Sequence, residues 1–169
     1  MQAKNDSFIT LKHFSNDNVK MTFEWLQNAG LRQLFAMKKA PKWERHLEYI
    51  KKTLLDHTQI MFAIYYKDIH IGNCGLKYIQ NREAAIWIYL GNENYKGKGL
   101  SKAACRQLIS YAKEELNLSL LYLHVLKDNI VALNLYNTLG FKRVPLDDVG
   151  ISIWKERSNS ILKMILPFD

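Results

Sequence analysis

Asn94-Tyr-Lys-Gly-Lys-Gly-Leu-Ser-Lys-Ala-Ala104 is the stretch of this sequence that decides the fold. Its two glycines, Gly97 and Gly99, stand directly before a run with the apolar spacing of a helix, so the backbone can turn tightly there and approach a ligand closely. The first amides of a helix lack partners inside it and lie at the positive end of its dipole, which favours an anion. Three lysines add positive charge around the same point: Lys96, Lys98 and Lys102. These are the properties of a phosphate-binding turn, although an ordinary turn with surface lysines would have the same residues.

The common nucleotide-binding motifs do not fit this turn. A P-loop requires Gly-x4-Gly-Lys-Ser/Thr, and that spacing is absent. A dinucleotide fingerprint requires a third glycine three residues after the second, where this chain has Lys102. The turn alone therefore leaves the class of phosphate ligand open.

The residues on either side of the turn predict a mixed α/β sheet in one domain spanning residues 1–169, because apolar runs and alternating patterns interleave with helical ones and no linker or repeat separates them. Strands are predicted over Phe8–His13, Ile60–Tyr66, Ile69–Tyr78, Arg82–Leu90, Leu118–Leu126, Phe141–Pro145, Ile151–Trp154 and Ile161–Leu166. Helices are predicted over Val19–Asn28, Trp43–Leu55, Leu100–Leu116 and Asn129–Leu139, with Gly140 as the C-cap of the last. The second, third and fourth strands form an antiparallel meander, and Asp147–Gly150 is predicted as a turn.

Composition excludes a membrane protein and a metal site. The longest strongly apolar run, Ile60–Tyr66, is far shorter than the roughly 20 residues that a membrane-spanning helix requires. The polar start, Met1–Ser7, lacks the apolar core of a signal peptide, so we expect a cytoplasmic protein. Cys74 and Cys105 lie far apart and without metal-ligand spacing, which indicates small buried residues and no metal.

The net charge of +8 favours an anionic partner, such as nucleic acid or a polyphosphate ligand. With 12% aromatic residues, a nucleic-acid-binding module without catalysis is a possible class. The positive residues are dispersed, however, and the chain has no arginine-rich tail. The decision between these classes comes from a second motif.

The stretch Asn94–Ala104 resembles the signature of the GNAT acetyltransferases, an Arg/Gln-x-x-Gly-x-Gly/Ala loop that binds the pyrophosphate of acetyl-CoA. Val125–Phe141 is similar to the second signature of that family: a strand that ends before Asn129-Ile-Val-Ala132, an aromatic residue one helical turn further (Tyr136), and Gly-Phe. Asn94 departs from the pattern, because Arg or Gln is usual there. The resemblance implies a mostly antiparallel central sheet flanked by helices, with a splay between the fourth and fifth strands that admits acetyl-CoA. Nucleic acid would have no need of the paired motif.

The resemblance assigns roles to individual residues. Cofactor binding falls to Ile88, Tyr89, Leu90, Tyr95, Lys96, Gly97, Lys98, Gly99, Leu100, Ser101, Lys102, Asn129 and Tyr136. Tyr136 would also protonate the departing thiolate, a task that suits a phenol because its reference pKa of about 10 exceeds the value of about 8.5 for a thiol. The alternative is that Tyr136 is an aromatic residue packed in the core. For the base that deprotonates the acceptor amine, the candidates are Glu83, His124 and His46, each also explained as a structural residue.

The aromatic N-terminal third is similar to that of nucleotide-sugar N-acetyltransferases of bacterial surface-glycan pathways, the pseudaminic acid type. This implies acetyl transfer to a nucleotide-linked amino sugar, with Trp25, His46 and Asn73 as substrate-binding candidates. A related pattern occurs in ribosomal-protein N-terminal acetyltransferases, so a protein N-terminus stays an alternative, as does a small amine. Strand edges after Ile151 leave a homodimer open.

Overall fold

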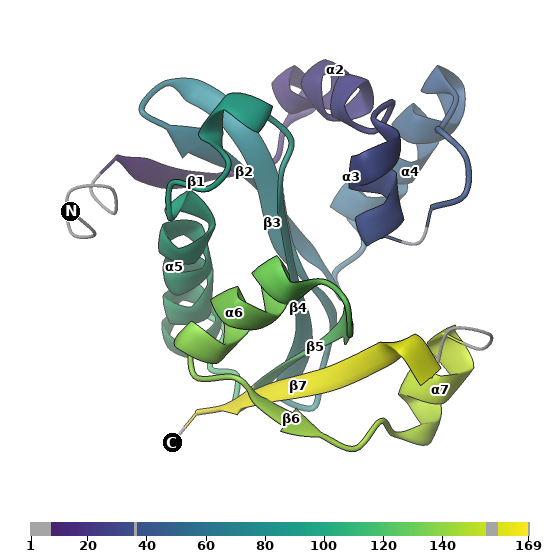
Figure 1. Ribbon diagram of the computed structural model, residues 1–169. Coiled ribbons are helices and arrows are strands. Elements are labelled where there is room, and N and C mark those ends of the chain that lie inside the picture. The colour runs from purple at the N-terminus through teal and green to yellow at the C-terminus, as the bar shows by residue number, and fades with distance from the viewer. Residues whose placement is uncertain (1–7, 36, 155–158, 169) are drawn as a thin grey trace.

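Seven strands in the order β1-β2-β3-β4-β5-β7-β6 form the sheet of this protein (Figure 1), seen in a computed structural model that describes residues 8–35, 37–154 and 159–168. The strands are β1 (Ile9–His13), β2 (Ile60–Tyr66), β3 (Ile69–Gln80), β4 (Glu83–Leu90), β5 (Leu120–Leu126), β6 (Lys142–Val144) and β7 (Ile161–Pro167). The helices are α2 (Asn16–Trp25), α3 (Ala29–Leu34), α4 (Trp43–Leu55), the 3-10 turn η1 (Glu93–Tyr95), α5 (Leu100–Glu114), α6 (Ile130–Thr138) and α7 (Asp148–Trp154). The polar stretch Met1–Ser7 lies outside the described residues.

The predicted splay is present between β4 and β5. These two strands are the parallel pair of the sheet, and they are paired only from Glu83↔Leu120 to Ala85↔Tyr122. Beyond that point β4 stays paired with β3 as far as Leu90, and β5 stays paired with β7 as far as Leu126. The two strands therefore diverge over their second halves, and the mixed, mostly antiparallel fold is confirmed.

The sheet carries helices on two faces, because alternate residues of each strand point in opposite directions. On β2, Phe62 and Ile64 belong to the main apolar cluster with Leu108 of α5. Met61 and Ala63 belong instead to a smaller cluster with Val19 of α2 and Ile50 of α4, so the sheet separates α5 from α2 and α4. Figure 1 shows α5 and α6 together on the near side of the sheet.

The predicted strand at Ile151–Trp154 and the predicted turn at Asp147–Gly150 were wrong, because both lie in or beside α7. The Asp147 side chain accepts a hydrogen bond from the Gly150 amide at 2.8 Å, which is how an N-cap starts a helix. Asp and Gly favour hairpin turns as well as helix starts, so the sequence did not separate the two. The strand at that edge of the sheet is β6, and the expected strand edge after Ile151 is absent from the described residues.

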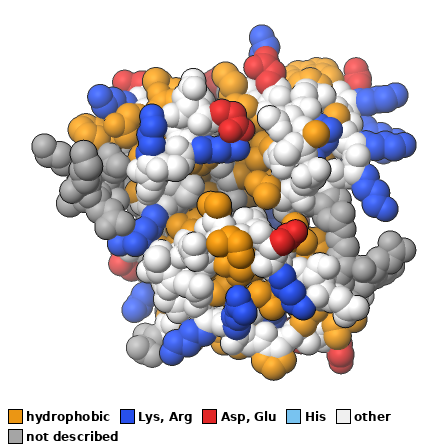
Figure 2. Space-filling model, viewed as in Figure 1, with side chains coloured by type: hydrophobic (Ala, Val, Ile, Leu, Met, Phe, Trp, Pro, Cys, Tyr) orange, Lys and Arg blue, Asp and Glu red, His pale blue; other side chains and the backbone are white. Residues whose placement is uncertain are grey.

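The short helix α3 was not predicted, and β3 extends two residues beyond its predicted end. Asn28 starts α3 by accepting a hydrogen bond from the Leu31 amide at 3.2 Å. No helix in the described parts of the chain has the length and apolar content needed to cross a bilayer. Figure 2 shows Lys and Arg side chains over much of one face of the molecule, with several of them close together at its upper right edge.

Candidate functional site

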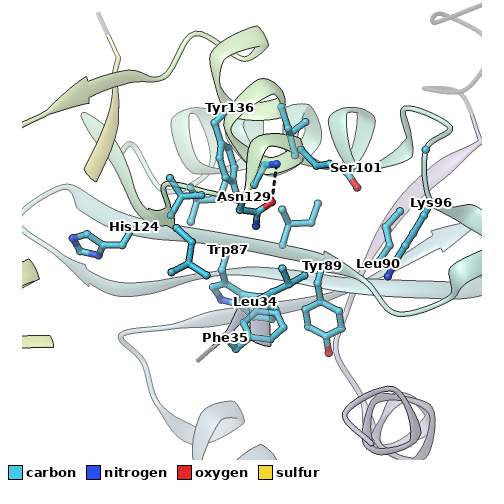
Figure 3. Close-up of a pocket in the computed structure, with 18 of the residues that line it drawn as sticks. Leu34, Phe35, Trp87, Tyr89, Leu90, Lys96, Ser101, His124, Asn129 and Tyr136 are labelled. Carbon is cyan, nitrogen blue, oxygen red and sulfur yellow. Dashed lines mark hydrogen bonds between the residues drawn. The ribbon is translucent and has the colours of Figure 1, made fainter. Parts of the chain in front are cut away.

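A cavity of about 530 Å³ fills the gap between the diverging halves of β4 and β5 (Figure 3). One end is lined by the glycine loop, at Lys96, Gly97 and Ser101. The cavity continues past Asn129 and Tyr136, which come from the start and the middle of α6. The two motifs that stand about 30 residues apart in the sequence therefore line one continuous space.

The glycine loop has the backbone conformation that its sequence predicts. Gly97 and Gly99 have φ angles of 71° and 75°, a region that side chains strongly disfavour. No atom lies within 4 Å of a Cβ built on either glycine, so conformation and not packing requires glycine here. Gly99 is also the N-cap of α5 and has no side chain to accept a hydrogen bond from the first amides of that helix. These amides are suited to an anionic ligand.

The side chains of the glycine loop differ in their contacts and in their exposure to solvent. Lys96 pairs with Glu93 at 2.6 Å, which offsets part of its charge, and the Lys98 ammonium lies 5.6 Å from the centre of the Tyr95 ring. Leu100 is buried in the core, so only its backbone is available to a ligand. Lys102 follows on the first turn of α5 and is half-buried.

The backbone of β4 offers hydrogen-bond donors to the gap. The Leu120 amide donates to the Arg82 carbonyl, so the even-numbered residues of β4 direct their backbone groups toward β5. In the diverging half these include the amides of Ile88 and Leu90, and β5 is no longer paired there. A long ligand with amide groups and an anionic end would find partners along this whole cavity, and the loop, the strand and Asn129 fit such a molecule.

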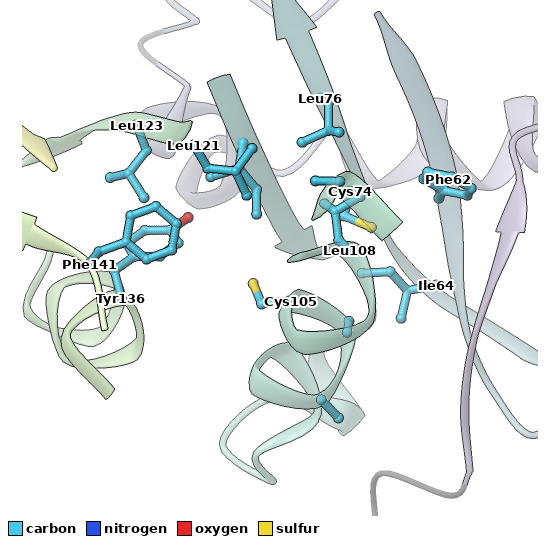
Figure 4. Packing of buried hydrophobic residues seen from close by; sticks show 14 of the residues in the cluster. Phe62, Ile64, Cys74, Leu76, Cys105, Leu108, Leu121, Leu123, Tyr136 and Phe141 are labelled. Carbon is cyan, nitrogen blue, oxygen red and sulfur yellow. The ribbon is translucent and has the colours of Figure 1, made fainter. Parts of the chain in front are cut away.

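Asn129 and Tyr136 reach the cavity from α6. The Asn129 Oδ1 caps α6 by accepting from the Ala132 amide at 3.2 Å, which leaves its amide nitrogen for a ligand (Figure 3). Tyr136 is buried, and its ring lies edge-on to Phe141 at 5.6 Å between centroids; Figure 4 shows both beside Leu121 and Leu123. Burial, followed by the neighbouring Cys105, raises the pKa of Tyr136, so its hydroxyl stays protonated at neutral pH.

A second cavity of about 630 Å³ lies on the opposite face of β4, beside α2 and α4. Five residues line both cavities and mark their junction: Phe35, Ile86, Trp87, Tyr89 and Trp154. Figure 3 places Tyr136 and Asn129 on one side of β4 and Trp87, Tyr89 and Phe35 on the other. Arg45 and Lys77 supply positive charge to the second cavity, and no Asp or Glu is found among the described residues that line either cavity.

Lys77 is held at the wall of the second cavity by aromatic residues. Its ammonium donates to the Tyr49 hydroxyl at 3.1 Å and lies 5.6 Å from the centre of the Trp87 ring. Arg45 stands one helical turn before Tyr49 on α4, so both side chains project from the same face of that helix. The composition and charge of this wall suit an anionic ligand with a planar or sugar-like part.

Two of the predicted substrate and base residues line the cavities, and three do not. His124 lines the first cavity and His46 the second. Glu83 is exposed at the far end of β4 from the loop and lines neither cavity. Trp25 also lines neither; it packs so closely on Gly91 that a Cβ there would lie 1.9 Å from its ring. Asn73 is fully buried between β3 and α2.

Burial favours the neutral form of the imidazole in both His124 and His46. Burial lowers the pKa of His124, nearby Lys163 lowers it further, and Asp147 opposes the change. Burial also lowers the pKa of His46, whose Nε2 lies 3.2 Å from the Val19 carbonyl. The parallel register pairs Ala85 of β4 with Tyr122 of β5. Two residues further along both strands, His124 therefore stands across the gap from Trp87, and both lie on the same face of the sheet.

Unpaired polar atoms gather at the junction of the cavities. Three buried side-chain atoms have no hydrogen-bond partner within the described chain: Trp87 Nε1, His124 Nε2 and Trp154 Nε1. All three residues line a cavity, and an unpaired buried polar atom in a native structure requires an explanation such as a catalytic role or an ordered water. Trp154 and Lys77 were missed from the sequence, the first because α7 was assigned as a strand and the second because a lone lysine on a strand carries no signal.

Comparison with known proteins gives a consistent picture. The sequence profile of the acetyltransferase (GNAT) domain matches residues 9–142. Acetyltransferase PseH of Campylobacter jejuni is 30% identical over 136 residues, which cover 79% of this chain and 84% of PseH. The spermine/spermidine N(1)-acetyltransferase of Bacillus subtilis is 33% identical over 64 residues, 37% of this chain and 42% of that enzyme.

Solved structures share the fold. The crystal structure of PseH in complex with acetyl coenzyme A superposes with a TM-score of 0.71 at 22% identity, covering 95% of this chain and 99% of PseH. The spermidine N-acetyltransferase of Vibrio cholerae, solved with CoA and spermine, gives a TM-score of 0.83 at 20% identity and covers 95% of this chain and 96% of that one.

Proposed function

This chain belongs to the GNAT acetyltransferase family and is an acetyl-CoA-dependent N-acetyltransferase, and on that premise we propose that its acceptor is the amino group of a nucleotide-linked amino sugar. The cavity between β4 and β5 takes the cofactor, and the second cavity takes the acceptor. The amine reaches the acetyl group at the junction of the two, where Trp87 and Tyr89 line both.

The charge of the acceptor cavity carries this proposal. Arg45 and Lys77 line it, and its described lining contains no carboxylate. A nucleotide sugar brings a diphosphate, which pairs favourably with such cations, and a base or sugar ring, which can lie against Tyr49 and Trp87. Similarity to PseH over most of both chains supports the same class of acceptor.

A polyamine is the second candidate, because similarity to the spermine/spermidine N(1)-acetyltransferase of Bacillus subtilis favours it. A polyamine carries several positive charges, and these would face Arg45 and Lys77 without a carboxylate among the described lining. Like charges in a partly desolvated site disfavour binding. The cavity therefore supports the amino sugar over the polyamine.

The cofactor would be held along the whole first cavity. The amides from Lys96 to Leu100 would bind the pyrophosphate at the start of α5. Asn129 would donate its amide nitrogen to the pantetheine arm, and the Ile88 and Leu90 amides would donate to oxygens of the same arm and of the acetyl group. When bound, acetyl-CoA supplies the acetyl group as an activated thioester.

Proton transfer would be divided between the two faces of the sheet. Tyr136, on the α6 side of β4, keeps its hydroxyl proton at neutral pH because burial raises its pKa, and this proton would go to the thiolate as the carbon–sulfur bond breaks. His124, across the gap from Trp87 on the acceptor face, can take the proton of the attacking amine, because its lowered pKa keeps it neutral. Amine and thiolate would then exchange protons with different residues, and a covalent enzyme intermediate is not required.

The test measures acetyl transfer to a UDP-linked 4-amino sugar, to spermidine and to a peptide N-terminus under identical conditions. Titration calorimetry with acetyl-CoA alone first establishes cofactor binding, which charge reversal at Lys96 should weaken. We expect the amino sugar to have the highest kcat/KM. Turnover of spermidine or peptide without turnover of the amino sugar would refute the proposed acceptor while leaving the cofactor assignment intact.

Charge reversal at Lys77 gives a sharper prediction. Lys77→Glu should lower kcat/KM for the amino sugar by about tenfold or more and raise it for spermidine, since a charged pair in a partly buried site contributes roughly 1.5–3 kcal/mol. Lys51→Glu, an exposed change on the outer side of α4, is the control and should alter neither. An unchanged ratio between the two acceptors in Lys77→Glu would contradict the role given to this lysine.

A further inference from the structure

A buried polar network connects the acceptor side of the molecule with β4. Asn73 is fully buried in the middle of β3 and stands directly opposite Tyr89 across the β3–β4 ladder. Its amide nitrogen donates to the Tyr89 hydroxyl at 2.7 Å and to the Thr22 hydroxyl of α2 at 2.9 Å. Asn73 thus joins β4 to the helix whose Thr22 lines the acceptor cavity.

The orientation of the Asn73 amide is fixed by its other partner, His70. The His70 Nε2 lies 2.9 Å from Asn73 Oδ1 and 3.0 Å from the Gly72 carbonyl. Both are acceptors, so Nε2 must carry the ring proton. The Nδ1 is then an acceptor, and it faces the side-chain nitrogen of Asn18 at 3.4 Å. The Asn73 and Asn18 amide nitrogens and the His70 Nε2 therefore each meet an acceptor, and a connected buried network of this kind favours one arrangement of its side chains.

Tyr89 is the residue that this network holds in place. Tyr89 lines both cavities, and its ring stacks on Trp87 at 6.1 Å and lies edge-on to Phe35 at 5.1 Å. Its two neighbours on β4, Ile88 and Leu90, direct their amides into the cofactor cavity. A displacement of the Tyr89 ring would therefore change both the wall of the acceptor cavity and the course of β4 beside the cofactor.

We propose that Asn73 is a positioning residue that acts through Tyr89: it fixes the Tyr89 ring as the wall between the acceptor and cofactor cavities, so that the amine, and not water, reaches the acetyl group. Asn73 itself touches neither cavity, which distinguishes this role from the substrate contact expected from the sequence. The inference requires only acetyl transfer and not the acceptor named above.

The network offers a matched pair of variants. Tyr89→Phe and Tyr65→Phe each remove one hydroxyl that accepts a hydrogen bond from a buried asparagine of the network, Asn73 at 2.7 Å and Asn18 at 2.8 Å. Tyr65 lines neither cavity. The two variants should lose similar thermal stability. Any difference between them in catalysis then comes from the position of the Tyr89 ring between the two cavities and not from a general loss of stability.

The experiment measures kcat and KM for transfer, the Kd of acetyl-CoA, and the rate of acetyl-CoA hydrolysis without an added acceptor. In Tyr89→Phe we expect kcat for transfer to fall about tenfold, hydrolysis to rise, and the Kd of acetyl-CoA to stay within about twofold. In Tyr65→Phe the ratio of transfer to hydrolysis should stay at the wild-type value. Asn73→Ala combined with Tyr89→Phe should lower that ratio no further than Tyr89→Phe alone, because both act on one wall.

An equal loss of transfer in Tyr65→Phe and Tyr89→Phe, or an unchanged ratio in Tyr89→Phe, would overturn the inference. If Asn73→Ala does not fold, the two tyrosine variants still decide the question. Hydrolysis uses water alone and is measured even when neither a UDP-linked 4-amino sugar nor spermidine is acetylated. A rise in hydrolysis in Tyr89→Phe without transfer to the amino sugar would leave this inference standing and refute the proposed acceptor.

Discussion

At the scale of single residues, most of the residues assigned to the cofactor line the first cavity, whereas of the three assigned to the acceptor only His46 lines the second. Asn129 and Tyr136 line the first cavity because their positions follow a local rule: an N-cap, then an inward-facing residue about two turns of helix later. Glu83 and Trp25, chosen by residue type, lie away from both cavities. Arg45 and Lys77 come together only through packing of α4 against the sheet, which no local pattern predicts.

Tyr136 permits a test at this scale. Tyr136→Phe keeps the ring against Phe141 but removes the proton donor, so kcat should fall by roughly 10²-fold or more. The Kd of acetyl-CoA from calorimetry should stay nearly constant, because the hydroxyl contributes to proton transfer and little to binding. Tyr111→Phe is the control: it is another helix tyrosine packed on an aromatic residue, Phe62, and it lines neither cavity. Full activity in Tyr136→Phe would exclude it as the acid.

At the scale of elements, strands and helices with strong periodicity were predicted well, and short capped pieces were not. Trp43–Leu55 and Ile60–Tyr66 match the observed α4 and β2 at both ends, since their apolar patterns are long and unambiguous. α3 and α7 are short and depend on the side chains of Asn28 and Asp147 for their first turn. Such caps use the same residues as turns, so the choice is made by tertiary contacts.

The loop before α5 gives the prediction at this scale. Gly99→Ala places a side chain at φ 75°, which costs about 1–2 kcal/mol. Because open space surrounds the position, this free-energy cost arises from the backbone conformation and not from a steric clash. We expect it to weaken the binding of acetyl-CoA roughly tenfold, with a modest change in Tm. Gly30→Ala, at a helical position of α3, should leave the affinity for acetyl-CoA unchanged. Equal affinities for wild type and Gly99→Ala would show that the loop conformation is not required.

At the scale of the whole molecule, the order of the main elements and the splay were predicted and are confirmed, with the short helices α3 and α7 as the exceptions. The order and the splay were both predicted from the two long motifs and from strands whose apolar pattern can be recognised in the sequence alone. The pairing β5–β7–β6 was beyond prediction, because it joins segments that are distant in the sequence.

Three partly buried histidines predict how stability depends on pH. Burial lowers the pKa of His46, His70 and His124 below the ordinary value of 6.5. The unfolded chain therefore takes up protons before the folded one does, so stability is fully present above about pH 6.5 and is lost as pH falls toward the folded values. The Tm from calorimetry should decrease by several degrees between pH 7.5 and 5.5. In His57→Gln, a change at an exposed residue, the same decrease should persist; a constant Tm in the wild type would contradict the prediction.

The divergence of β4 and β5 also gives this protein an edge strand in its interior. Edges normally lie at the rim of a sheet, where their unpaired groups recruit other chains and promote aggregation. Here the diverging half of β4 is enclosed by α6 on one side and by the aromatic junction on the other, so a foreign strand has no access to it. The molecule can therefore keep a row of backbone donors ready for a slender ligand that adds to the sheet as a strand would. The amides of Ile88 and Leu90 should accordingly exchange with deuterium much more slowly once acetyl-CoA is bound.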